Sequence, residues 1–180
     1  PWTSKGENGN SNVLESGVSK VCTLSDGYFA AIKTDGSVVV WGWGAPGVWL
    51  QKEDADVIRF VEISDQLSSD VVNIFSTGRA AAALKSDGSV VTWGEKISGG
   101  DSSSVVSQIS SDVISISANA YSFAALKSDG SVVTWGEDAR GGDSSLVSDD
   151  LSSGVQKIYG SRDTFAALKD DGSVIAWGQY

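Results

Sequence analysis

The sequence predicts an all-β protein, a β-propeller-type array of four antiparallel blades. An Asp-Gly pair recurs four times, and a Trp-Gly pair follows six residues after each Asp. The segments around these pairs are rich in β-branched and aromatic residues and lack the long 3.6-residue apolar period of helices. Units of about 40 residues with about four short strands each are typical of propeller blades.

The tryptophans of the Trp-Gly pairs mark the period of the repeat. Trp41, Trp93, Trp135 and Trp177 are 52, 42 and 42 residues apart, so the first interval is ten residues longer than the others. We therefore expect a single domain over residues 1–180, with repeat cores at about 18–42, 71–94, 113–136 and 155–178 and an insertion at about 43–66.

The third unit shows the expected elements in chain order. They are a first strand that begins with Val113 and Ile116, a second strand at 123–127, a third strand at 131–135, a polar loop at 141–145 and a short outer strand at 146–151. The second and third strands are joined at Asp129-Gly130, because Asp-Gly supplies the positive φ that tight hairpins need.

Both faces of the third strand are largely apolar. Val133 and Trp135 point to one side, whereas Val132 and Thr134 point to the other. Such a strand suits a small sheet that packs against a neighbouring blade on each side. The alanines Ala124 and Ala125 of the second strand suit the crowded region near a propeller axis.

The stretch FAALKSDGSVVTWG at residues 123–136 resembles the repeat of the regulator-of-chromosome-condensation family, whose core reads ALxxDGxVxxWG, and related stretches recur in the other three units. The repeat length is closest to the short bacterial version, which the propeller-type β-lactamase inhibitory protein exemplifies. The resemblance implies a seven-bladed ring and protein–protein binding, whereas this chain has four repeats. The motif residues determine the fold, so the family's exchange-factor and inhibitor activities are not carried over. These structural residues are Trp41, Trp93, Trp135, Trp177, Gly36, Gly88, Gly130 and Gly172.

Four repeats leave the closure of the ring open. One alternative is a four-bladed ring in which the N-terminal stretch at 9–17, which resembles the segments before Val113 and Val155, pairs onto the last blade. A second alternative is half of an eight-bladed ring made by two chains, or a head-to-tail homopolymer. A third alternative is that the four repeats are part of a longer propeller. Because exposed sheet edges are a liability, an open half-ring monomer is the arrangement that we expect least.

The two ends of the predicted blades differ in how much the repeats vary. The Asp-Gly turns are nearly identical, whereas the loops between first and second strands differ and lie at the same end as the insertion. Loops that vary on a constant scaffold favour binding at that end. The candidate binding residues are aromatic or arginine, as interface hot spots are: Tyr28, Trp43, Trp49, Arg79, Tyr121, Arg140 and Arg162.

The composition argues against several classes of function. The chain has no His and a single Cys22, which excludes Ser-His-Asp and Cys-His catalysis and a Cys-rich zinc site. Its formal net charge of −10 opposes binding to nucleic acid or anionic membranes. The GGDSS loops at 99–103 and 141–145 are interpreted as polar turns because they lack the spaced carboxylates of a calcium loop. We therefore expect no enzymatic activity, no cofactor, no metal, no nucleic acid partner and no membrane insertion.

The sequence thus predicts a non-catalytic module that binds a protein partner through one variable loop face, as part of a bacterial or phage surface protein or adhesin. The acidic, Ser- and Gly-rich composition without Met suggests an extracellular location, or one at the cell or virion surface. One alternative is a propeller lectin that binds a glycan through Trp43, Trp49 and the loop tyrosines. Another is a structural repeat that self-assembles into rings or fibres.

Overall fold

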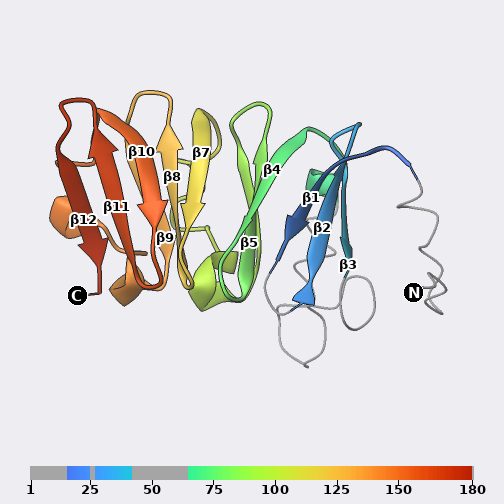
Figure 1. Ribbon diagram of the computed structural model, residues 1–180, viewed down its shortest axis with the longest axis horizontal. Coiled ribbons are helices and arrows are strands. Elements are labelled where there is room, and N and C mark those ends of the chain that lie inside the picture. Colours follow the sequence, from blue (N-terminus) through green and yellow to red (C-terminus); the bar gives the residue numbers. More distant parts are fainter. Residues whose placement is uncertain (1–15, 25–26, 42–64, 180) are drawn as a thin grey trace.

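The computed structural model describes residues 16–24, 27–41 and 65–179, which form four antiparallel three-stranded sheets in sequence order. The sheets stand side by side along the long axis of the molecule (Figure 1). The prediction of four antiparallel blades is confirmed. The insertion predicted at 43–66 lies outside the described residues except for its last two positions.

Each blade contributes three consecutive strands, and the middle strand pairs with the other two. Blade 1 holds β1 (Val18–Thr23), β2 (Phe29–Lys33) and β3 (Val38–Trp41), and blade 2 holds β4 (Val71–Ser76), β5 (Ala80–Lys85) and β6 (Val90–Gly94). Blade 3 holds β7 (Val113–Ala118), β8 (Ser122–Lys127) and β9 (Val132–Gly136), and blade 4 holds β10 (Val155–Gly160), β11 (Thr164–Lys169) and β12 (Val174–Gly178).

The register is the same in every blade. The second residue of the paired segment faces the motif tryptophan, as Phe123 faces Trp135, Phe165 faces Trp177 and, in blade 2, Ala81 faces Trp93. The first strand of each blade contains an irregularity after its first residue, for example between Val113 and Ser115. Equivalent positions in different blades are therefore identified directly from the pairing.

The prediction of an outer strand at 146–151 is wrong. The chain forms a 3₁₀ turn, η6 (Ser145–Val147), and then a further turn in which the Leu151 N–H donates to the Val147 carbonyl at 3.1 Å. Val147 and Leu151 pack into the core while Leu146 is fully exposed, so the apolar residues that face inward are four apart. That spacing belongs to a helical turn, whereas a strand needs alternate residues.

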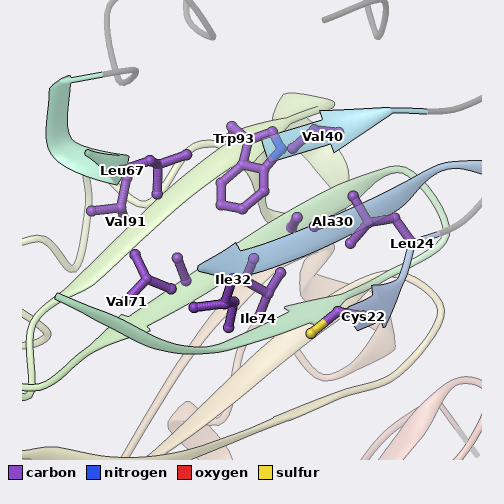
Figure 2. Packing of buried hydrophobic residues seen from close by; sticks show 12 residues of the cluster. Cys22, Leu24, Ala30, Ile32, Val40, Leu67, Val71, Ile74, Val91 and Trp93 are labelled. Atoms are coloured by element: carbon purple, nitrogen blue, oxygen red, sulfur yellow. The ribbon is translucent and has the colours of Figure 1, made fainter. Parts of the chain in front are cut away.

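The core of the array lies between the blades. Each blade has a leading face, which meets the preceding blade, and a trailing face, which meets the following one. Between blades 2 and 3, Ala82 and Leu84 of the trailing face pack with Ile116, Phe123 and Trp135 of the leading face. Figure 2 shows the corresponding cluster between blades 1 and 2, in which Ile32 and Val40 face Ile74 and Trp93. Burial between blades is therefore the main hydrophobic contribution to stability.

Small residues in the middle strands let the large rings fit. Ala80, Ala82 and Ala124 are completely buried, and their size leaves room for the aromatic pair of the next blade. The Phe123 and Trp135 rings stack with centroids 5.2 Å apart, and the Trp135 indole N–H donates to the Gly99 carbonyl at 3.0 Å. The same pair recurs in blade 4, where the Trp177 indole donates to Gly141 at 3.2 Å.

Each Asp-Gly turn in blades 1–3 also contacts the next blade through a backbone hydrogen bond. The Val113 N–H of blade 3 donates to the Gly88 carbonyl of blade 2 at 3.1 Å. Gly88 has a φ of +80°, and a Cβ on it would lie 2.7 Å from the Asp112 nitrogen. Gly36 and Gly130 make the same contact, whereas nothing lies within 4 Å of a Cβ on Gly172 in the last blade. The sheets are thus not closed into a ring, and the array is open at blades 1 and 4.

A carboxylate stabilises each of these turns from within. Asp129 Oδ1 accepts hydrogen bonds from the Ser131 backbone N–H at 2.9 Å and from the Ser131 hydroxyl at 2.6 Å. The hydroxyl bond, followed by the backbone bond, lowers the pKa of Asp129 below its ordinary value of 3.8. The same lowering of the pKa by a serine two residues later occurs at Asp35, Asp87 and Asp171.

The contact between turns and blades predicts unequal effects at equivalent glycines. Gly172→Ala should lower the free energy of unfolding by about 1–2 kcal/mol, because Ala is strained at positive φ. Gly88→Ala should lower the free energy of unfolding by roughly 1–3 kcal/mol more than Gly172→Ala does, because its Cβ also collides with the backbone of the next blade. Urea denaturation of the two variants measures the difference, and equal losses would show that the turn does not bear on the neighbouring blade.

The turn carboxylates predict a dependence of stability on pH. A lowered pKa in the folded state stabilises the fold above the ordinary value of 3.8, and this stabilisation is lost as the pH falls through the lowered pKa. Ser131→Ala should raise the pKa of Asp129, and its stability deficit relative to the parent should be full at about pH 6 and shrink in acid. Carboxyl NMR titration follows Asp129 directly. The control Ser128→Ala removes a neighbouring exposed hydroxyl, and an equal shift of the pKa in that variant would contradict the assignment.

Candidate functional site

The two ends of the array differ in structure. The Asp-Gly turns lie along one end, at the top of Figure 1, and the loops between first and second strands lie along the other. The second end also holds the turns after the third strands, namely η4 (Lys96–Gly100) and η5 (Asp138–Arg140). We call this end the loop face, and its described residues in blades 2–4 are 77–79, 95–98, 119–121, 137–140 and 161–163.

Arg140 is the centre of the best-defined cluster on the loop face. Its guanidinium carbon lies 4.1 Å from the centroid of the Tyr121 ring, in cation–π geometry. The same group forms ion pairs with Asp163 of blade 4 and, at 3.4 Å, with Glu137. The hydrogen bond to Asp163 is the main reason that the pKa of Arg140 is raised. Arg140 therefore joins the loops of blades 3 and 4.

Buried polar side chains fix the backbone beneath this cluster. The Asn119 side-chain amide donates to the Arg140 carbonyl at 2.7 Å, and the Ser122 hydroxyl donates to the same carbonyl at 2.7 Å. The Asn119 Oδ1 accepts from the Tyr121 and Ser122 backbone N–H groups at 2.8 Å each. In blade 2, the equivalent Thr77 donates to the Ser98 carbonyl at 3.0 Å.

Backbone hydrogen bonds link the loops of successive blades. The Gly78 N–H donates to the Ala120 carbonyl at 2.8 Å, and the Ala120 N–H donates to the Arg162 carbonyl at 3.1 Å. The loops are consequently held at a fixed spacing, although their side chains differ from blade to blade.

A second group of exposed side chains lies on blade 2. Arg79 and Glu95 form an ion pair at 3.1 Å, and Ile97 nearby is 65% exposed. Ile97 also lines an open groove of about 540 Å³ between the turns of blades 2 and 3, together with Lys96, Glu137 and Ala139.

The structure places the residues singled out in the sequence as follows. Tyr121 and Arg140 are in contact, and exposed Arg162 lies in the same loop as Asp163, their ion-pair atoms 3.9 Å apart. Arg79 belongs to the separate group on blade 2, whereas Tyr28 packs against the cluster between blades 1 and 2. Trp43 and Trp49 lie outside the described residues.

The motif tryptophans of blades 2–4 serve the core. Trp93, Trp135 and Trp177 are buried between blades, and Trp41 ends β3. The GGDSS loops also serve the fold, because a Cβ on Gly99 would lie 2.6 Å from the Phe123 ring and one on Gly141 would lie 2.8 Å from the Phe165 ring. Within the three described ranges, no group of His, Cys, Asp or Glu has the arrangement of a metal site.

The sequence reasoning missed Ile97, Glu95, Glu137 and Asp163. Ile97 carries a detectable signal, since it is an apolar residue in a polar loop where the next repeat has Ala139. The ion pair between Arg140 and Asp163 joins different blades, and no spacing within one repeat indicates it. No helix among the described residues has the length and apolar character needed to cross a membrane.

The comparisons with known proteins agree with this architecture. Residues 113–141 match the family model for the regulator of chromosome condensation (RCC1) repeat. A search of curated proteins found no match.

Solved structures with the same fold include human WBSCR16, at 19% identity and a TM-score of 0.55, over 89% of this chain and 47% of that one. Yeast RCC1 (Prp20), solved with Kap60, is similar at 16% identity and a TM-score of 0.57, and the match covers 91% of this chain and 44% of that one. The ectodomain of the Arabidopsis thaliana receptor kinase ACR4 is similar at 18% identity and a TM-score of 0.52, and the match covers 86% of this chain and 54% of that one. This chain spans about half the length of each. With the fourfold recurrence of the same strands and turns, these likenesses show an open β-propeller array, and the segment 113–141 in its third blade is similar to the RCC1 repeat.

Proposed function

We propose that this protein is a non-catalytic binding module whose loop face contacts a protein partner. The observation that carries the proposal is the contrast between the two ends of the blades. The Asp-Gly end has the same turn and the same carboxylate hydrogen bonds in every blade. The loop face presents different side chains in each blade on a backbone that hydrogen bonds hold in place.

The side chains on the loop face suit recognition of a folded protein. Arg79, Ile97 and Arg162 are exposed, and the pair of Arg140 and Tyr121 forms a fixed platform beside them. Arginine and aromatic residues dominate the binding energy of many interfaces. Because the loops are already ordered, binding loses little conformational entropy.

The charges of the loop face indicate a partner surface of mixed character. Arg79 and Arg140 are paired with Glu95, Glu137 and Asp163, so the face is not a uniformly basic patch. The net charge of the chain, −10, further disfavours a polyanion. A protein surface that offers both acidic and apolar groups matches this face best.

Two of the similar structures point in the same direction. Prp20p from Saccharomyces cerevisiae is characterised by its binding properties to Gsp1p and histones, and yeast RCC1 was solved bound to Kap60. Those partners belong to the yeast protein. They support protein binding as the general role of such repeats, while the partner of this chain is a separate question.

The glycan alternative has less support. The described motif tryptophans, which a sugar would need as stacking platforms, are buried between blades. Trp43 and Trp49 lie outside the described residues.

The proposal predicts that the loop face is required for binding. In affinity capture from the native source, the triple variant Arg79→Ala, Ile97→Ala and Arg162→Ala should lose the partner that the parent captures. With the partner purified, the dissociation constant should rise by about tenfold or more, because exposed Arg and apolar contacts are removed from the interface centre.

The matched control changes the opposite end. Ser86→Asp with Ser128→Asp alters exposed residues beside the Asp-Gly turns and shifts the net charge by the same two units as the triple variant. This control should bind like the parent, with an unchanged melting temperature in both variants. If the control loses the partner while the triple variant keeps it, the binding surface is not the loop face.

A further inference from the structure

Two large apolar side chains on the leading face of blade 1, Val21 and Phe29, are exposed, although their counterparts in the other blades are buried, and Ala31 between them on the same face is completely buried. Val21 of β1 is 56% exposed, whereas the equivalent Ile74, Ile116 and Ile158 are 4–6% exposed. Phe29 is 38% exposed, whereas the equivalent Phe123 and Phe165 are at most 1% exposed. Among the described residues, no other sheet packs on Val21 and Phe29.

The trailing face of blade 4 shows the complementary pattern. Val174 is 62% exposed and Tyr159 is 50% exposed. Leu168 is half-buried, whereas the equivalent Leu84 and Leu126 are buried at 6% and 3% in the clusters between blades. These side chains hold the positions that pack on the next blade everywhere else in the array.

The backbone hydrogen-bonding groups of blade 1 and blade 4 are also complementary. Gly17 enters blade 1 with a φ of +72°, the same value as Gly154 at the entry to blade 4. The Gly17 carbonyl accepts from Thr34 at 2.7 Å, as the Gly154 carbonyl accepts from Asp170 at 2.9 Å. Blade 1 therefore begins with the backbone geometry of a junction between blades.

The other half of such a junction lies at Gly172. In blades 1–3 the Asp-Gly turn glycine accepts a hydrogen bond from the first strand of the next blade at 3.0–3.1 Å. Gly172 has the same conformation, with a φ of +85°, and open space around it. A strand placed there like β10 on blade 3 would put its first N–H at the Gly172 carbonyl.

We propose that the leading face of blade 1 docks onto the trailing face of blade 4 of a second copy of this chain. The junction repeats the three inside the chain: Val21 takes the place of Ile158, and Val18 donates to Gly172. It is a head-to-tail interface, because each copy contributes a different face. The inference is independent of the proposed function, since the loop face and the end faces share none of the residues named for binding.

A second copy is the occupant that the observations favour. The junction requires an RCC1-type blade in a fixed register, with an apolar leading face and an N–H at its first strand residue. This chain itself presents that blade at one end and its receptor at the other. Two copies that close into a ring bury both faces of each, whereas apolar faces and strand edges left exposed favour aggregation.

The test uses one charged substitution on each face. Val21→Asp disables the leading face and leaves the trailing face intact, and Val174→Asp does the reverse. Sedimentation equilibrium of the parent chain should give a dimer or a larger assembly. Each variant alone should be monomeric, with association weakened by about tenfold or more because a charge would be buried without a partner. An equimolar mixture of the two variants should form a 1:1 heterodimer through the one remaining functional junction.

The mixing experiment distinguishes this junction from other modes of association. Leu146→Asp, at a fully exposed position away from both faces, is the control and should assemble like the parent. Circular dichroism checks that all variants stay folded. A folded parent that is monomeric at all concentrations would overturn the proposal, and so would variants that dimerise on their own or fail to pair on mixing.

Discussion

Everything in this fold depends on the packing of one blade's trailing face against the next blade's leading face. A three-stranded sheet with alanine in its middle strand and valine, phenylalanine and tryptophan around it has two apolar faces and covers neither by itself. Ala124 and Leu126 on one side meet Ile158, Phe165 and Trp177 on the other, and together they exclude water. Stability in such an array is a sum over junctions, so a blade is only as stable as its neighbours allow.

The same constraint explains why the two ends of the blades diverge. At the Asp-Gly end the turn glycine touches the backbone of the next blade, so neither a side chain nor a different turn fits at Gly36, Gly88 or Gly130. At the loop face the blades are joined through backbone groups, as between Gly78 and Ala120, and side chains are free to differ. Function is therefore expected where the packing constraint is weakest.

Much of the fold was predictable because its determinants are local. Asp-Gly followed by an apolar strand and Trp-Gly fixes a hairpin, and its recurrence fixes the blades. The structure of the segment 146–151 was not predictable in this way, because Val147 and Leu151 can pack into the core from a helical turn as well as from a strand. The arrangement of the loop face was predictable only in part. Topology indicated which loops gather at one end, but the ion pair between Arg140 and Asp163 depends on how blades 3 and 4 are placed relative to each other.

Amide hydrogen exchange tests most directly whether junctions, rather than single blades, hold the structure together. It is best done on the chain carrying both Val21→Asp and Val174→Asp, so that only internal junctions contribute. The account predicts that β5 and β8, which have a blade on each side, exchange most slowly, and that β2 and β11 exchange faster by the equivalent of one lost junction. Equal protection of all four middle strands would contradict it, because each sheet would then be stable without its neighbours.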